Sequence, residues 1–205
     1  MGLVEGHPIF ARVWQFISER EDKAGQNEYR QELLAGARGT AVELGAGNGR
    51  NFAHYPASIE RVVAVEPEPY LRERAIEAAA GAPVAVEVVE GADDPLPVED
   101  DSVDVAVACL VLCSVPDQAR ALGELRRALR PGGELRFYEH VIARRPRQAQ
   151  FFRLADRSGV WPKLGAGCHL SRDTGAAIEQ AGFTIERMRR LTFNGLPHIL
   201  GVARA

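Results

Sequence analysis

Five short apolar runs alternate with helix-like segments along the middle of this chain, and the alternation restricts the fold more than any other feature. The helix-like segments, with apolar residues at helical spacing, cover 50–56, 68–80 and 117–130. The runs are "AVEL" (41–44), "RVVAVE" (61–66), "VAVEVV" (84–89), "VDVAVACLVL" (103–112) and "ELRFYEHV" (134–141). Nearly continuous apolar strands, each followed by a helix, are typical of a parallel sheet covered on both faces.

The last part of the chain departs from this pattern. Two further strands are predicted at 184–193 and 196–205, with no helix between them. Asn194-Gly195 lies near their joint, and this dipeptide is typical of tight hairpins. We therefore expect the last strand to run antiparallel to an otherwise parallel sheet.

With 205 residues, the chain is long enough to bury a core as one domain. The pattern divides it into an N-terminal helical cap (1–38), a core (39–143) and a C-terminal part with two helices and the final strand pair (144–205). Within the cap, apolar spacing predicts helices over 7–18 and 27–39, separated by the polar segment "EDKAGQ".

Charge and cysteine content exclude several classes of protein. The net charge is −3 and the short basic clusters are scattered, so we expect no nucleic-acid partner. Three cysteines, with Cys109 and Cys113 in an apolar run, indicate a reduced, cytoplasmic protein. The N-terminal segment has no basic start followed by an uninterrupted apolar stretch, so we expect no signal peptide and no membrane anchor. Either a monomer or a homodimer fits the composition.

The first strand leads into a glycine cluster, "GAGNG", with glycines at positions 45, 47 and 49. Glycines there permit positive φ and let backbone amides approach a ligand, and we expect a helix to follow from about Arg50. In the dinucleotide fingerprint the third glycine comes three residues after the second, whereas here it comes two after. Alone, the cluster does not distinguish a ligand loop from a glycine-rich turn.

Two acidic positions favour a ligand that contains adenosine. Glu66 ends the second strand, where a carboxylate can accept both ribose hydroxyls and disfavours a 2′-phosphate. After the third strand, Ala92, Asp93 and Asp94 form an acidic turn placed to meet an adenine. The alternatives are a polar residue at a strand end and an ordinary solvated loop.

Taken together, these stretches resemble the class I S-adenosylmethionine-dependent methyltransferases. "VELGAGNGRNF" is similar to the glycine loop of that family, "VVAVEPEP" to its ribose-binding strand end, and "GADDPLPVEDDSVDVAV" to its adenine loop. "LVLCSVPDQ", "LRPGGELRFYEHV", "GCHLSR" and "PHILGVA" resemble the narrower group that includes the alkyl-thiol S-methyltransferases. "LCSV" stands where many quinone-pathway relatives have "LHHV".

The resemblance implies a fold, a cofactor and the residues that bind it. The expected fold is a Rossmann-like, doubly wound α/β domain whose mostly parallel seven-stranded sheet has the order 3-2-1-4-5-7-6. The expected cofactor is S-adenosylmethionine. Glu43, Gly45, Gly47 and Gly49 are implied to contact its methionine part, and Glu66 the ribose, with Pro67 beside it. The implied adenine contacts are Ala92, Asp93 and Asp94. Leu110 is implied to lie close to the sulfonium.

Candidate catalytic residues lie where strands end on the carboxyl side of the sheet, the usual ligand crevice in such folds. His140 is the first candidate for a general base, and Cys113 is the second. Because strand side chains alternate, Glu139 and His140 point in opposite directions. A structural histidine and a buried apolar cysteine are the alternatives. The spacing of Cys109, Cys113, Cys168 and the histidines matches no zinc pattern, so we expect strand geometry to scatter them and predict no metal site.

The sequence thus predicts an enzyme that methylates a small, apolar acceptor at a thiol, a phenol- or quinone-type oxygen, or an amine. A carbon or oxygen methyltransferase of quinone or secondary metabolism is the first alternative. A nicotinamide-dependent oxidoreductase is a second, against which the glycine spacing argues. A third is a methyltransferase-like binding module without activity.

Overall fold

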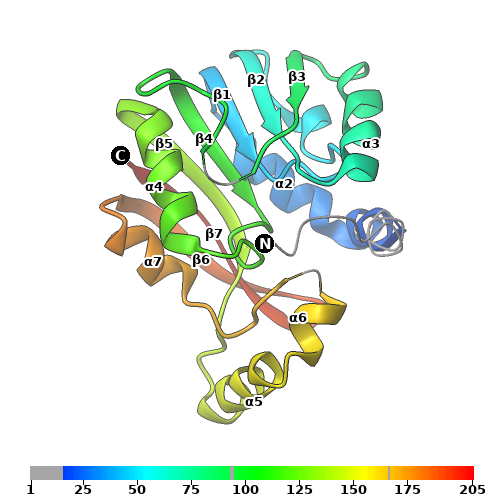
Figure 1. Cartoon of the computed structure of the whole chain (residues 1–205), viewed down its shortest axis with the longest axis vertical. Helices are drawn as coiled ribbons and strands as arrows, with labels where there is room; N and C mark the ends of the chain where they lie inside the picture. Colours follow the sequence, from blue (N-terminus) through cyan, green and yellow to red (C-terminus); the bar gives the residue numbers. More distant parts are fainter. Residues whose placement is uncertain (1–15, 93–94, 166) are drawn as a thin grey trace.

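A computed structural model describes residues 16–92, 95–165 and 167–205. Its centre is a seven-stranded sheet in the order β3-β2-β1-β4-β5-β7-β6, which confirms the predicted topology (Figure 1). Parallel pairs join the first five strands of that order. The strands are β1 (Gly39–Leu44), β2 (Ile59–Val65), β3 (Ala85–Val89), β4 (Val103–Cys109), β5 (Leu129–His140), β6 (Thr184–Phe193) and β7 (Leu196–Arg204).

The predicted antiparallel strand is β7, which pairs with β5 on one side and β6 on the other. The β6–β7 turn has φ of 48° at Asn194 and 78° at Gly195. Two consecutive positive φ angles match the twist of a tight hairpin, which explains the Asn-Gly dipeptide. This confirms the last strand as the antiparallel member of the sheet.

Helices cover both faces of the sheet. Alternate strand residues point to opposite faces: Ala41 packs with Leu34 of α2, whereas Val42 belongs to the core that contains Leu122 of α4 and Ile178 of α7. The helices are η1 (Asp22–Gln26), α2 (Asn27–Leu34), η2 (Phe52–His54), α3 (Pro69–Ala79), α4 (Gln118–Ala128), α5 (Pro146–Arg157), α6 (Val160–Leu164) and α7 (Thr174–Gln180). Burial of both faces explains why the central strands β1 and β4 are largely apolar, whereas the edge strands β3 and β6 are more exposed.

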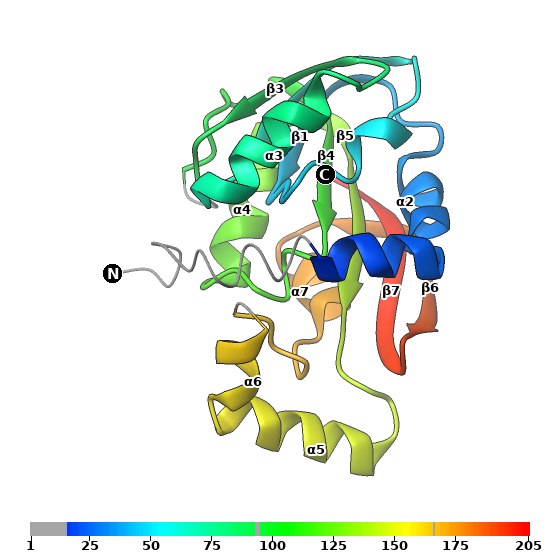
Figure 2. The ribbon, with the colours of Figure 1, turned by 90° about the vertical axis from the view of Figure 1, so that its right-hand side faces the viewer.

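Two groups of helices frame the carboxyl end of the strands. The helix that contains residues 16–21 and η1 crosses the end to which the β4 arrow points, and α5 and α6 lie beyond that same end (Figures 1 and 2). Ligands of open α/β sheets bind at this end. Among the described residues, none of the helices has both the length and the apolar character needed to cross a bilayer.

Several predicted bounds are wrong. The helix predicted over 27–39 ends at Leu34, and Gly39 begins β1. Instead of a helix over 50–56 there is a single 3-10 turn, because Pro56 requires Tyr55 to be extended (φ −64°, ψ 128°). The fourth strand ends at Cys109, and Leu110 turns the chain with φ of 57°. The segment "EDKAGQ" is helical, with a kink at Gly25 (φ 108°), since the side chains of its buried polar residues bond to α2. The first predicted helix, 7–18, lies largely outside the described residues.

Candidate active site

The glycine loop after β1 needs glycine for steric reasons. Gly45, Gly47 and Gly49 have φ of 64°, 58° and 75°, a region that other residues rarely adopt. A Cβ on Gly45 would overlap a methyl group of Val111, and one on Gly49 would lie 2.8 Å from the Cβ of Ala78. The loop therefore brings bare backbone to the carboxyl end of the sheet, where a ligand can approach it closely.

Glu66 is bound to this loop through its carboxylate. Its side chain accepts the Gly47 amide at 2.7 Å and the Glu68 amide at 3.0 Å, and the residue is 5% exposed. Burial raises its pKa to about 7, although the two amides act in the opposite direction. Arg72 donates to the carbonyls of Glu66 and Pro67 and so holds this strand end. Carboxylate lone pairs remain for hydroxyl donors of a ligand.

Glu43, also predicted to contact the cofactor, lies beneath the glycine loop. It is 2% exposed and accepts the Tyr55 hydroxyl at 2.6 Å and the Asn51 side-chain amide at 2.8 Å. Burial raises its pKa to about 7 against the effect of these two donors. Tyr55 and Asn51 follow the loop in the chain, so Glu43 fixes the path of the loop from below.

Arg30 of α2 is the central residue of a buried network that sequence reasoning missed. Its guanidinium donates to Asp22 at 3.1 Å, to Gln26 at 3.0 Å and to Asn51 at 2.9 Å, and also contacts the Cys109 sulfur at 3.2 Å. The residue is only 6% exposed. Since Asp22, Asn51 and Cys109 are 8, 21 and 79 positions away from Arg30 in the sequence, no local pattern could have found the network.

The N-terminal segment lies against the glycine loop. Asn48 donates to the Ser18 hydroxyl at 3.1 Å, and Arg50 pairs with Glu19 at 3.0 Å. Arg50 also approaches Asp22 at 3.5 Å, which connects this contact to the Arg30 network. The cap thus holds the loop from two directions.

The segment after β4 turns across the site and is held by Glu139. The Leu110 amide donates to the Tyr138 carbonyl at 2.7 Å. The next three amides, of residues 111–113, donate to the fully buried Glu139 carboxylate at 3.0, 2.9 and 3.2 Å. Burial raises the pKa of Glu139 in spite of these donors. Glu139 therefore positions the backbone at the predicted sulfonium end and faces away from His140, as alternation predicts.

The predicted adenine loop is only partly described. Ala92 is exposed, as a ligand-contacting loop position requires, and Asp93 and Asp94 lie outside the described residues. Just before them, Gly91 passes close to β2, where an added Cβ would lie 2.9 Å from a Val65 methyl group. The loop therefore starts beside the strand that ends in Glu66.

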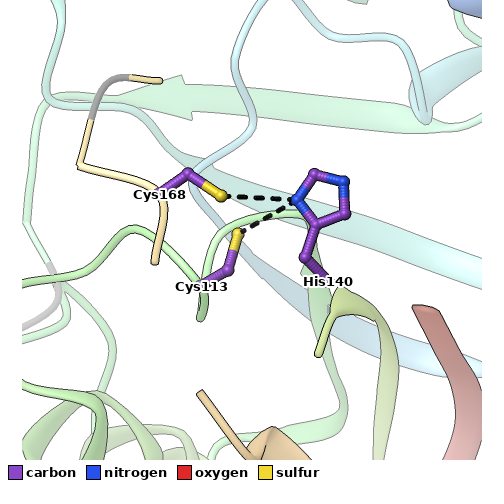
Figure 3. A group of neighbouring side chains, drawn as sticks. All are labelled: Cys113, His140 and Cys168. Carbon is purple, nitrogen blue, oxygen red and sulfur yellow. Dashed lines mark hydrogen bonds between the residues drawn. The ribbon is translucent and has the colours of Figure 1, made fainter. Parts of the chain in front are cut away.

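His140 and Cys113, the two candidate catalytic residues, lie together. The Nδ1 of His140 is 4.0 Å from the Cys113 sulfur and 3.4 Å from the Cys168 sulfur (Figure 3). The expectation that the fold scatters the cysteines is wrong for Cys113 and Cys168. The segment after β4, the end of β5 and the loop after α6 lie at the same end of the sheet. Cys109 lies apart, beside Arg30.

His198 on β7 lies directly opposite His140 in the strand register, with ring centroids 4.3 Å apart. Its Nδ1 bonds to the Leu196 carbonyl at 2.9 Å. Burial, with a smaller effect from His140, lowers its pKa to about 3. His198 therefore stays neutral and serves as a packing partner for His140.

Comparison with known proteins agrees with this geometry. A family described as a methyltransferase domain matches residues 42–137. The human thiol S-methyltransferase TMT1B is 37% identical over 96% of this chain and 84% of its own length. Human thiol S-methyltransferase TMT1A is 36% identical over 79% of this chain and 69% of its own length.

Solved structures share the fold at low identity. A putative methyltransferase from Bacillus halodurans has a TM-score of 0.72 at 14% identity, covering 87% of this chain and 97% of its own. A geranyl diphosphate methyltransferase in complex with S-adenosylmethionine has a TM-score of 0.70 at 16% identity, covering 87% and 84%. The chain belongs to the class I S-adenosylmethionine-dependent methyltransferases, in the group related to the thiol S-methyltransferases, and its cofactor is S-adenosylmethionine.

The described residues fit this cofactor. Gly45 and Gly47 are partly exposed and bear no side chain, so a ligand can approach their backbone at the carboxyl end of the sheet. The buried carboxylate of Glu66 beside the loop suits the paired hydroxyls of a ribose, which donate hydrogen bonds.

Proposed function

We propose that this methyltransferase acts on the sulfur of a small, apolar thiol. Relatives named thiol S-methyltransferase match nearly the whole chain, which makes a thiol the leading acceptor class. The observation that carries the proposal is an apolar, sulfur-containing cluster around His140, at the same end of the sheet as the glycine loop. Its buried members are Cys113, Ala143, Phe152, Cys168 and Leu170, and Trp161 and Leu196 pack against them.

We further propose that residues 1–205 act as one domain in which cofactor and acceptor meet at the carboxyl ends of β1, β2, β4 and β5. Bound S-adenosylmethionine supplies an activated methyl group on a sulfonium sulfur. Glu66 would bind the ribose beside Pro67, and Ala92, Asp93 and Asp94 the adenine. Gly45, Gly47 and Gly49, supported by Glu43, would contact the methionine part, with Leu110 close to the sulfonium.

At the acceptor end, the chain has to orient the nucleophile, exclude water and ensure that the nucleophile has lost its proton. The thiolate, not the thiol, is the reactive form of a thiol acceptor. His140 and Cys113 are the side chains that we place next to that sulfur. The neighbouring helices α5 and α6, which contribute Phe152 and Trp161, supply the apolar wall.

An isosteric acceptor series tests this proposal. Purified enzyme with methyl-labelled cofactor is offered thiophenol, phenol and aniline, and the products are identified by mass spectrometry. We expect the methyl thioether as the main product. Preferential methylation of phenol at its oxygen or at a ring carbon, or of aniline at its nitrogen, would instead support an oxygen, carbon or nitrogen methyltransferase and refute the thiol assignment.

A further inference from the structure

Cys113, His140 and Cys168 form a compact group of metal-ligand atoms, which we name the thiol–imidazole cluster. They come from the loop after β4, the end of β5 and the loop between α6 and α7. Their two sulfurs and an imidazole nitrogen all lie within 4.8 Å of one another. Both sulfurs are directed toward the same nitrogen, Nδ1 of His140, at 3.4 and 4.0 Å (Figure 3).

These spacings match the edges of a tetrahedral zinc site. Zn–S bonds of about 2.3 Å and Zn–N bonds of about 2.0–2.1 Å place a sulfur and a nitrogen ligand about 3.6 Å apart. The two observed sulfur–nitrogen distances, 3.4 and 4.0 Å, lie on either side of that value. Shifts of about 0.2–0.4 Å bring these two sulfur–nitrogen distances to the tetrahedral value, and the two sulfurs already lie within 4.8 Å of one another.

The backbone around the cluster is held by hydrogen bonds. Glu139 fixes the amides of residues 111–113, as described above, and the carbonyl of Cys113 accepts the His169 amide at 2.8 Å. The loop that carries Cys168 is held by Asp156, which accepts the amides of Leu170 and Ser171 at 3.1 and 2.8 Å. Fixed ligand positions reduce the ordering cost of binding an ion.

Burial and charge also suit a divalent ion. Cys113 is 1% and Cys168 7% exposed, within an apolar surrounding. Two thiolates and a neutral imidazole neutralise one divalent cation, so the ion-bound site has no net charge to bury before the acceptor binds. Thiolate and imidazole ligands select zinc-like ions over magnesium or calcium, which prefer oxygen.

We propose that the thiol–imidazole cluster binds a zinc-type divalent ion and that the acceptor's sulfur takes the fourth ligand position. The second half of this proposal rests on the proposed thiol acceptor. The part of the chain that the structure describes supplies three ligands. Three protein ligands and one open position are typical of catalytic zinc sites, whereas structural sites are closed by a fourth protein ligand. In this arrangement His140 is a metal ligand and not a general base.

The chemistry balances without a further reagent. The acceptor binds as its thiolate and releases its proton to the solvent, because a coordinated thiol is deprotonated. A lone pair of the acceptor's sulfur then forms the new S–CH3 bond. At the same time the bond between that methyl group and the sulfonium sulfur of the cofactor breaks, and its electron pair stays on the cofactor's sulfur. The products are a neutral methyl thioether and S-adenosylhomocysteine. The thioether is a weaker ligand than the thiolate and leaves the ion.

Metal binding by the full chain, kept reduced, tests the site independently of activity. The measurements are zinc content by mass spectrometry and titration with Co2+, whose charge-transfer and d–d bands report sulfur ligands and tetrahedral geometry. We expect one ion per chain. Cys113→Ser, Cys168→Ser and His140→Gln should each lower zinc affinity by at least about 100-fold, since even the loss of an outer-shell partner costs about 10- to 100-fold. Cys109→Ala and His169→Gln are the matched controls and should bind normally.

The acceptor arm uses the Co2+ form and thiophenol, with phenol as control. We expect thiophenol alone to shift the charge-transfer band, and removal of the ion by a chelator to slow thiol methylation. Absence of saturable metal binding, or equal binding by the serine variants, overturns the site. Thiol methylation at full rate in the metal-free protein overturns the role of the ion but leaves the thiol acceptor standing. Metal binding without methylation of any thiol contradicts the proposed function instead.

Discussion

Replacing Glu66 with glutamine should weaken binding of S-adenosylmethionine through two effects. The carboxylate accepts the amides of Gly47 and Glu68 through separate oxygens, and glutamine keeps only one of these acceptors. The charge-assisted hydrogen bonds to the ribose are also lost. We expect a cost of about 1–3 kcal/mol near pH 8, which is about a 5- to 150-fold rise in Kd.

The same substitution should change the pH dependence of binding. With a pKa of about 7, Glu66 is about one tenth ionised near pH 6 and about nine tenths ionised near pH 8. Ribose hydroxyls donate to the ionised form, so wild-type affinity should rise about tenfold between these pH values and Glu66→Gln should remove most of that rise. The stability of the cofactor-free protein should change with pH in the opposite direction to cofactor affinity. The raised pKa of Glu66 stabilises the fold below about pH 4.5, and this stabilisation is lost as the pH rises through 7.

Isothermal titration calorimetry with S-adenosylmethionine at several pH values measures both effects. The matched control is Glu90→Gln, which removes an acidic group that pairs with Arg72 near the same strand edge and whose side chain is 77% exposed. The control should bind as the wild type does. Unchanged affinity in Glu66→Gln near pH 8 would falsify the ribose assignment. A loss of equal size near pH 6 and near pH 8 would refute the argument from its pKa.

Three further predictions concern the scaffold of the site. Gly45→Ala should reduce cofactor affinity at least about tenfold and lower the free energy of unfolding by about 1–3 kcal/mol, because the new methyl group meets Val111 at a positive φ. Calorimetry measures the loss of affinity and urea unfolding the loss of stability. Wild-type values for both would contradict the packing argument. Arg30→Met should destabilise the fold by about 3–5 kcal/mol in urea unfolding, since the buried Asp22 then keeps only the longer ion pair with Arg50. A loss below about 1 kcal/mol would show that Arg50 or water replaces the Arg30 contact. Asp117→Ala should cost about 1 kcal/mol as α4 loses the side chain that accepts its first amides, with no change in cofactor affinity at pH 8.

Much of the cofactor side could be predicted because its signals are local. The glycine loop directly follows a strand, and Glu66 ends the neighbouring strand, so parallel pairing alone brings the two together. The errors arose where tertiary contacts override local pattern. The apolar stretch after Cys109 continues the strand pattern, yet it turns because Glu139 binds its amides. The polar segment before α2 is typical of a loop, yet it is helical because its polar side chains bond to Arg30.

By itself, the sequence determined the class of fold, because hydrophobic periodicity, turn residues and strand ends act over a few residues. The strand order and the reading of the glycine loop as a cofactor loop were implied by the family resemblance. The tertiary structure decided which distant side chains meet. His140 is 27 and 28 positions from Cys113 and Cys168, and neither spacing resembles a metal-binding motif. The three meet because β4 and β5 are adjacent in the sheet and the loop after α6 returns to their ends. Contacts of this kind depend on the packing of whole elements, which no local pattern records.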